Sequence, residues 1–289
     1  MCADRSVSAR VVDSRYVDEV EILNGGAVNA GRVVRLGDVI RRPVPSNAST
    51  LHSLLRHFRS VAFDGAPLPV GVDGDTEIME FVDGDVAVAP YPAWANTESA
   101  LTTVAMLLRR LHDASVSWRV PVDAAWSTAL ADPEGGAVIC HNDVCLENVV
   151  FRRGSAAALI DFDFAAPGRR VWDVVMTARY WVPVTDPDLP TATARGLRDP
   201  IARLRAFIDA YGLEDSDRRS VVEVLLQAED VSRRFVEAEA SRGAPAFIAM
   251  WDEDARRRFE RKVDWIHRNA ATITEALVHT QSTESTPSL

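Results

Sequence analysis

The sequence predicts an α+β fold of two lobes: a small N-terminal lobe built on an antiparallel sheet and a larger, mainly helical C-terminal lobe. Three observations predict it. Short β-like runs separated by glycine turns occupy residues 17–42, a strongly amphipathic helical pattern covers residues 97–114, and helical periodicity returns from residue 199 onward. With 289 residues, 47% of them hydrophobic, the chain is long enough to bury a large core.

Three β-like runs near the N-terminus predict an antiparallel meander. The runs are residues 17–23, 32–36 and 39–42. The glycine-rich segment 24–31 separates the first two runs, and a turn at Gly37-Asp38 separates the second from the third. We expect the meander to end at Pro43 and Pro45, because proline has no amide hydrogen to donate to a sheet.

A helix is expected after the meander. Residues 46–61 begin with capping residues and carry apolar side chains at helical spacing, namely Leu51, Leu54, Leu55 and Phe58. After a turn over residues 71–75, the apolar stretch 78–82 predicts one more strand. The smaller lobe is therefore expected to cover residues 1–82.

The larger lobe, residues 83–289, is expected to be mainly helical. Residues 97–114 predict a helix whose buried stripe is Leu101, Val104, Leu108 and Leu111. From about Asp199 onward the pattern predicts three helical segments, with the tryptophans there and upstream serving as packing. The polar residues 280–289 predict a disordered tail.

Composition excludes several classes of function. The formal net charge of −10 disfavours nucleic-acid binding, because phosphate contacts need a basic surface. No apolar run approaches the ~20 residues that cross a bilayer, and the first residues lack the apolar core of a signal peptide, so we expect a cytoplasmic protein without membrane contact. Lys262 is the only lysine, and no glycine-rich turn precedes it, which excludes a Walker A phosphate loop.

Two further site types find no support. Cys140, His141 and Cys145 lie close in sequence, but a structural zinc needs four ligands, usually from two knuckles, and no second CxxC or HxxxH occurs. The odd number of cysteines, which includes Cys2, disfavours a disulfide framework. A serine hydrolase is disfavoured because the chain has no G-x-S-x-G elbow.

The residues that can carry chemistry cluster in residues 137–164. In order they are His141, Asp143, Asn148, Asp161 and Asp163. An apolar strand leads into the loop that holds the first two, and two β-like runs around a tight turn precede the last two. A strand tip and the hairpin after it should therefore bring these polar side chains to one place.

This set has the residue types that phosphoryl transfer needs. One carboxylate must accept the proton of the attacking hydroxyl, and hard oxygen ligands must hold Mg²⁺ on the nucleotide phosphates. We predict that Asp143 is the base and that Asn148 and Asp161 are metal ligands. For Asp163 two interpretations stay open, a second metal contact and a solvated neighbour. His141 is a candidate at the catalytic step, although bracing of the loop by hydrogen bonds is the favoured interpretation.

The pattern His141-x-Asp143, Asn148 and Ile160-Asp161-Phe162-Asp163 resembles the catalytic and metal-binding loops of the aminoglycoside phosphotransferase and choline kinase families, relatives of the protein kinases. The resemblance extends over nearly the whole chain and includes residues 107–114. It implies a protein-kinase-like fold, ATP or GTP as co-substrate, Mg²⁺ and a small hydroxylated acceptor. It also implies that Asp173 supports the catalytic loop.

The N-terminal resemblance is weaker. Residues 24–31 do not have the G-x-G-x-x-G form, although Gly25, Gly26 and Gly31 would let the backbone approach phosphates. The resemblance places the hinge between the lobes at Glu80, Phe81 and Val82, which would contact the base through backbone groups.

The lysine that pairs with the α- and β-phosphates in these families is absent. Arg41 or Arg42 stands at its place, and arginine can hold phosphate through a bidentate fork. The helix that follows also lacks the acidic partner of that lysine and offers His52 instead. We therefore predict an arginine supported by His52, and the choice between the two arginines stays open.

Alternatives remain for the activity and for the acceptor. A nucleotide-binding pseudokinase is the main rival, because the lysine and its acidic partner are missing. The acceptor can be an aminoglycoside-like antibiotic, a choline-like alcohol, an amino acid or a sugar. Acidic residues near the C-terminus either attract an amine or form a solvated helix face, which is the favoured interpretation: Glu229, Asp230, Glu237 and Glu239.

Overall fold

The computed structural model describes residues 20–23, 31–189, 195–197 and 199–278. Its N-terminal part is an antiparallel sheet with the strand order β1-β2-β3-β5-β4. The strands are β1 (Val20–Leu23), β2 (Val33–Leu36), β3 (Val39–Pro43), β4 (Pro69–Asp73) and β5 (Thr76–Glu80). The predicted meander is confirmed at its three strands, although the segment 24–30 that joins the first two lies outside the described residues.

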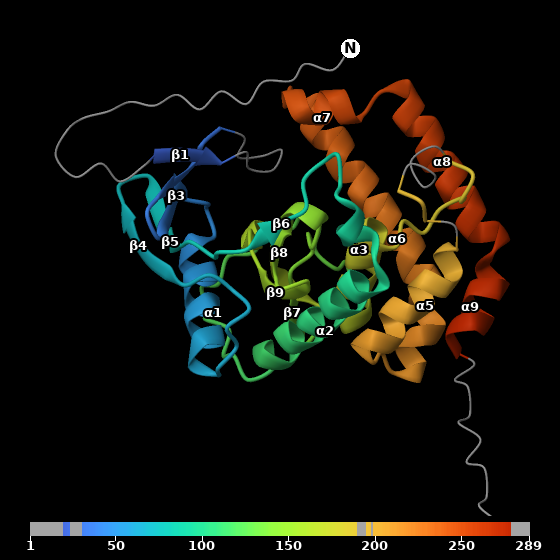
Figure 1. Cartoon of the computed structure of the whole chain (residues 1–289), viewed down its shortest axis with the longest axis horizontal. Helices are drawn as coiled ribbons and strands as arrows, with labels where there is room; N and C mark the ends of the chain where they lie inside the picture. Colours follow the sequence, from blue (N-terminus) through green and yellow to red (C-terminus); the bar gives the residue numbers. More distant parts are fainter. Residues whose placement is uncertain (1–19, 24–30, 190–194, 198, 279–289) are drawn as a thin grey trace, which may run out of the picture.

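Helix α1 (Ala48–Ser60) packs beside this sheet (Figure 1). Its four predicted apolar residues are all buried, as an amphipathic helix requires. The expected turn over residues 71–75 is wrong in extent, because β4 continues to Asp73. The chain reverses at Gly74, whose φ of +60° is a conformation that glycine adopts without strain.

The C-terminal part surrounds two small sheets with helices (Figure 1). One sheet pairs β7 (Val138–Cys140) with β10 (Ala166–Gly168), and the other has the order β6-β8-β9, from strands β6 (Asp85–Val86), β8 (Val149–Arg152) and β9 (Ser155–Leu159). Helix α2 (Glu98–Ser115) confirms the predicted helix almost to the residue, and its predicted stripe is buried. Thr97 caps it by accepting a hydrogen bond from the amide of Ala100.

Helix α3 (Arg170–Trp181) follows β10, and further helices complete the lobe. They are α5 (Pro200–Tyr211), α6 (Asp215–Ser241), α7 (Pro245–Met250), α8 (Glu253–Arg268) and α9 (Ala270–Val278). The prediction of three helical segments after Asp199 is therefore wrong, since the structure has five within residues 199–278. Gly243 adopts a φ of +85° after the end of α6, and Asp252 caps the start of α8. The apolar periodicity alone does not show that helices end and begin at these residues.

One hydrophobic core joins α1, α2, α3, α5 and α6. Trp172 and Trp181 are wholly buried in it and Trp265 is buried at its edge, which agrees with the predicted packing role. No helix within the described ranges is long and apolar enough to cross a membrane. The sheet and α1 end before residue 82, so the predicted lobe boundary remains compatible with the structure; the predicted tail lies outside the described residues.

Candidate active site

A cavity of about 550 Å³ lies between the N-terminal sheet and the β8–β9 hairpin. Side chains from both lobes line it, including Arg42, Glu77, Phe81, Asn148, Asp161 and Phe162. This volume lies within the range of small-molecule and cofactor pockets. The predicted metal ligands Asn148 and Asp161 therefore face the same cavity as the N-terminal lobe.

Local backbone structure explains how the hairpin brings these residues together. Strand β7 ends at Cys140, immediately before the catalytic loop, and β8 and β9 return the chain to the same place. The amide of Ile160 donates to the carbonyl oxygen of Asn148 at 3.0 Å, which ties the end of the hairpin to its start. Asp161 then adopts a left-handed conformation with φ of +63°, a costly conformation for a non-glycine residue that is often found at functional sites.

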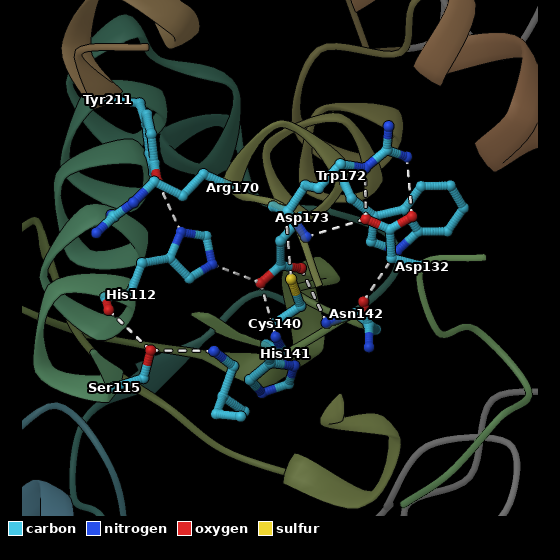
Figure 2. Close-up of polar contacts among 12 residues, drawn as sticks. His112, Ser115, Asp132, Cys140, His141, Asn142, Arg170, Trp172, Asp173 and Tyr211 are labelled. Atoms are coloured by element: carbon cyan, nitrogen blue, oxygen red, sulfur yellow. Dashed lines mark hydrogen bonds and ion pairs between the residues drawn. The ribbon is translucent and has the colours of Figure 1, made fainter. Parts of the chain in front are cut away.

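Asp173 on α3 contacts the catalytic loop through its carboxylate (Figure 2). Its wholly buried carboxylate accepts hydrogen bonds from the amides of His141 (2.6 Å) and Asn142 (2.9 Å) and contacts Nε2 of His112 at 3.0 Å. Burial opposes its charge, but the hydrogen bond from His112 and the other partners outweigh burial and lower the pKa of Asp173. This geometry is the one expected of a supporting carboxylate.

Asn142, which the sequence analysis did not identify, also fixes the loop. Its φ is +68°, its side-chain nitrogen donates to the carbonyl oxygen of Phe164 (2.8 Å), and its side-chain oxygen accepts from Nε1 of Trp172 (3.1 Å). Trp181 likewise donates Nε1 to the carbonyl oxygen of Val144. Two buried tryptophans of α3 thus supply polar contacts as well as packing, which side-chain type alone did not reveal.

His141 is a brace of the loop. Its ring is wholly buried, lies 4.5 Å from the ring of Phe162 between centroids, and places Nε2 at 3.0 Å from the carbonyl oxygen of Ile160. Burial lowers the pKa of His141, so the ring is neutral and Nδ1 can accept from the amide of Asp143 (3.4 Å). The wholly buried ring and its hydrogen bonds favour the interpretation of His141 as a brace over a direct catalytic role.

Asp143 lies at the tip of the loop with both carboxylate oxygens oriented by donors. Oδ2 accepts from Nδ2 of Asn148 at 3.2 Å, and Oδ1 accepts from the hydroxyl of Tyr180 at 2.9 Å. Burial raises the pKa of Asp143, and the hydrogen bond from Tyr180 opposes that rise. The sequence analysis missed Tyr180. The signal was present, since Tyr180 lies seven residues after Asp173 and so faces the same side of α3.

Arg42 is the arginine of the cleft. Its Nε donates to Glu77 (2.5 Å), Nη1 to Asp161 (2.7 Å) and Nη2 to Asp163 (2.6 Å). The carboxylates outweigh burial and raise the pKa of Arg42, so it remains charged. Arg41 instead pairs with Asp73 at the surface, because successive side chains of a strand point to opposite faces. Of the two arginines, Arg42 lines the cavity, which favours Arg42 for the predicted phosphate contact.

Glu77 is the acidic partner that the sequence analysis missed. It lies directly opposite Arg42 in the β3–β5 register and is 1% exposed. His52 places Nε2 at 2.8 Å from the other oxygen of Glu77. The predicted support of the arginine by His52 is therefore indirect and passes through Glu77. The acid comes from β5 instead of from the helix.

The candidate metal ligands suit Mg²⁺, which prefers oxygen donors. Asp161 and Asp163 supply carboxylates, and Arg42 balances their charge. Asn148 uses its side-chain nitrogen on Asp143, so its side-chain oxygen remains as the donor for a metal. The contact of Asp163 with Arg42 favours a place at the site over a solvated neighbour. These metal-binding roles stay predictions.

The other predicted nucleotide contacts are less defined. Gly25 and Gly26 lie outside the described residues, and Gly31 has a φ of +73°. The hinge residues Glu80, Phe81 and Val82 line the cavity. The amides of Glu80 and Phe81 already donate to carbonyl oxygens of the sheet and its connections, so contact with a base would have to use other backbone groups of this segment.

A second group of ligand-type side chains surrounds Asp173. His112, Cys140 and Asp173 place one candidate ligand atom each within 4.8 Å of one another. Nδ1 of His112 contacts the hydroxyl of Tyr211 at 2.7 Å, and burial raises the pKa of Cys140. Hydrogen bonding already uses both nitrogens of His112 and both oxygens of Asp173, so this group is a structural hub (Figure 2).

Comparison with known proteins decides the family. The model of the phosphotransferase enzyme family matches residues 121–207, which contain the catalytic loop and the hairpin. The trifolitoxin immunity protein of Rhizobium leguminosarum bv. trifolii is 31% identical over 274 residues, which cover 90% of this chain and 99% of that protein. The chain belongs to the phosphotransferase enzyme family. The predicted enzyme class, a small-molecule phosphotransferase, is thus confirmed at the level of the family.

Two solved kinase structures share the fold. A choline/ethanolamine kinase family protein from Mesorhizobium loti superimposes with a TM-score of 0.62 at 16% identity, over 92% of this chain and 94% of that one. The gentamicin complex of APH(2")-IIa gives a TM-score of 0.51 at 13% identity, over 91% and 94% of the two chains. The predicted protein-kinase-like fold is confirmed.

Proposed function

We propose that this member of the phosphotransferase family transfers the γ-phosphate of ATP or GTP to a hydroxyl of a small molecule, with Mg²⁺ held in the cleft. One observation carries the proposal. Asp143 is hydrogen-bonded to Asn148, which lines the same cavity as Asp161 and Arg42. This arrangement supports a site in which Asp143 would be the base, Asn148 and Asp161 the oxygen ligands and Arg42 the phosphate-binding cation, the parts that phosphoryl transfer requires.

Asp143 is the proposed base. As the acceptor oxygen forms its bond to the γ-phosphorus, the bond from that phosphorus to the bridging oxygen breaks and leaves a nucleoside diphosphate; the hydroxyl proton passes to Asp143. Asn148 and Tyr180 fix the orientation of the carboxylate before the reaction. Such preorganisation accounts for much of enzymatic rate enhancement, and general base catalysis contributes about 10²–10⁴-fold.

Arg42 and the carboxylates Asp161 and Asp163 form the proposed phosphate and metal site. A bound Mg²⁺ would neutralise charge on the β- and γ-phosphates. Arg42 would then direct its two terminal nitrogens to phosphate oxygens, while Glu77 keeps Nε in place and fixes the position of the guanidinium. Buried Glu77 and His52 make this anchor rigid.

The biological role that we infer is protection against a toxic small molecule. The support is the name of the relative, an immunity protein, whose whole length this chain matches. Phosphorylation of a hydroxyl adds charge and bulk to a compound, which is sufficient to block a binding site made for the unmodified form. An assay decides whether the phosphate donor is ATP or GTP. It also decides whether the acceptor is an antibiotic or a metabolite.

The test is transfer of label from the γ-phosphate of ATP and GTP with Mg²⁺, measured with and without acceptor mixtures. Asp143→Asn should keep nucleotide affinity within about threefold and slow transfer at least about 100-fold. Asp73→Asn, an exposed acid outside the cleft, is the matched control and should be unchanged. Equal transfer by wild type and Asp143→Asn would refute the assignment of the base.

A pseudokinase is the second candidate, favoured by the ion pairs of Arg42 with both predicted metal carboxylates. It predicts that Mg²⁺ and ATP raise the melting temperature while no label is transferred to any acceptor or to water. Transfer above the level of Asp143→Asn excludes it.

A further inference from the structure

Three charged side chains from three helices meet behind the catalytic loop. Arg179 of α3 donates Nε to Oε1 of Glu229 on α6 at 2.8 Å, and Nζ of Lys262 on α8 contacts the same oxygen. Lys262 is the only lysine in the chain. The Glu229 side chain is 3% exposed, and those of Arg179 and Lys262 are 13% and 19% exposed, so the two cations reach the edge of the buried group.

The charges of this group do not balance within it. Burial opposes ionisation of Glu229, but Arg179 and Lys262 outweigh burial and lower the pKa of Glu229 to about 2. Within the group one anion therefore faces two basic side chains, although burial lowers the pKa of Lys262 and Asp143 is a second acid near Arg179. Nη1 of Arg179 reaches only the sulfur of Met176, at 3.8 Å, among the residues that the structure describes. Hydrogen-bond donors of both cations thus remain for a further acceptor.

A buried hydroxyl on α6, one turn beyond Glu229, is a second polar group that can take a partner. Ser232 follows Glu229 by three residues on α6 and so lies on the same helix face. It is 8% exposed, and its Oγ has no hydrogen-bond partner within the described part of the chain. Buried polar groups are nearly always paired in folded proteins. A ligand oxygen at this place would pair the hydroxyl and the cations together.

The group lies next to the proposed base. The guanidinium carbon of Arg179 is 5.8 Å from the ring centroid of Tyr180, whose hydroxyl donates to Asp143. Asp143 is the other acid that faces Arg179, but its carboxylate oxygens are bonded to Tyr180 and Asn148. One turn beyond Ser232, Phe235 packs on Phe164, with 5.3 Å between ring centroids. Along one face of α6 the charged group at Glu229, the hydroxyl of Ser232 and the ring of Phe235 therefore follow one another.

The four acids of α6 that were considered for attracting an amine pair with basic side chains. Asp230 pairs with Arg233 and Arg234, and Glu237 pairs with Arg233. Glu239, the last of the predicted acids, pairs with Arg242. Glu229 is bound to two cations. Asp230, Glu237 and Glu239 fit the favoured interpretation of a solvated helix face, whereas Glu229 is 3% exposed and does not.

We propose that the acceptor of the phosphotransferase is an alcohol that bears a carboxylate, which Arg179, Lys262 and Ser232 bind while the hydroxyl lies at Asp143. This inference rests on the proposed function and specifies its substrate class. Arginine and lysine both pair with carboxylates, and charge-assisted hydrogen bonds are the strong ones. The apolar part of the acceptor would lie on Phe235.

The experiment compares acceptors that differ only in charge. Purified protein with Mg²⁺ and γ-labelled ATP is given 3-hydroxypropanoate, 4-hydroxybutanoate and 4-hydroxymethylbenzoate, each beside its uncharged amide, and choline and gentamicin as cationic alcohols. We expect kcat/KM for at least one carboxylate to exceed that of its amide about 10-fold or more, the effect of one or two charge-assisted hydrogen bonds. The cationic alcohols should transfer no better than the amides.

Variants separate recognition from folding. Lys262→Gln leaves Glu229 paired with Arg179, and it should raise KM for the preferred carboxylate about 10-fold or more and abolish its advantage over the amide. Ser232→Ala, a smaller change, should weaken the same preference by a few fold. Arg257→Gln removes an exposed cation of α8 whose partners are Glu253 and Asp254, and it serves as the matched control.

The outcomes are distinct. Preference for amides, choline or gentamicin over carboxylates would overturn the inference and leave the proposed function standing. An unchanged carboxylate preference in folded Lys262→Gln would also overturn it. Absence of label transfer to every probe and to water would overturn the proposed function, and the inference with it.

Discussion

Replacement of Asp173 by asparagine tests how the catalytic loop is held. The buried carboxylate accepts two loop amides, from His141 and Asn142, and contacts His112. Asparagine keeps one acceptor oxygen and turns an NH₂ group toward a former donor, so at least one charge-assisted hydrogen bond is lost and one amide is left unpaired. At about 1.5–3 kcal/mol for such a bond and 1–3 kcal/mol for an unpaired buried group, we expect a loss of about 3–5 kcal/mol in the free energy of unfolding.

Chemical denaturation monitored by circular dichroism measures this loss, and a fall in Tm of about 5–15 °C should accompany it. Hydrogen exchange locates the effect, because the amides of His141 and Asn142 should lose protection before the rest of the C-terminal lobe. Asp113→Asn is the control: this carboxylate pairs with Arg170 but is half exposed, so its loss should cost less than about 1 kcal/mol. If Asp173→Asn and Asp113→Asn lose the same stability, the hub does not hold the loop.

Further predictions concern the anchor of the phosphate-binding arginine and the buried ion group. Arg42→Gln should raise KM for ATP about 10–100-fold while Arg41→Gln changes it less than twofold; equal effects would contradict the assignment of the cleft arginine. Glu77→Gln should raise KM for ATP by a smaller factor than Arg42→Gln, because the guanidinium remains but loses its anchor; a KM equal to wild type would show that the anchor is dispensable. The pKa of Glu229 is lowered to about 2, so its contribution of about 3 kcal/mol is present above pH ~4.5 and is lost as the pH falls toward 2. Urea unfolding between pH 6 and 3 measures how the free energy of unfolding falls with pH. This fall should be smaller in Glu229→Gln than in wild type, and an identical fall in both proteins would disprove the contribution.

The part of the site that sequence predicted is the part that lies close together in the chain. Asp143, Asn148 and Asp161 are linked by one strand tip and one hairpin, so their spacing is sufficient to place them in one cleft. Asp173 was placed by the resemblance to the kinase families, and the structure gives it the expected contacts with the loop. Local geometry and family pattern agreed at these positions.

The residues that sequence did not predict reach the site through tertiary structure. Glu77 became the partner of Arg42 because β3 and β5 pair in one register, which also decides that Arg41 points to the surface. A shift of one residue would exchange the two arginines. Tyr180 reaches Asp143 only because α3 packs under the loop. Neither the strand register nor the helix placement can be obtained from periodicity alone.

The breaks between the C-terminal helices illustrate a different limit. Apolar periodicity continues across Gly243 and Asp252, since residues on both sides face the same core. The chain nevertheless ends α6 and starts α8 at these positions, with a left-handed glycine and an aspartate cap. Capping residues mark helix ends more reliably than the apolar stripe does here.

Calorimetric titration of AMP-PNP with and without Mg²⁺ into wild type, Asp161→Ala and Asp143→Asn tests the central claim most directly. If Asp161 and Asn148 hold a metal–nucleotide complex beside the base, Mg²⁺ should tighten binding at least about 10-fold in wild type and in Asp143→Asn, and the gain should vanish in Asp161→Ala. The same Mg²⁺ gain in all three proteins would contradict the account.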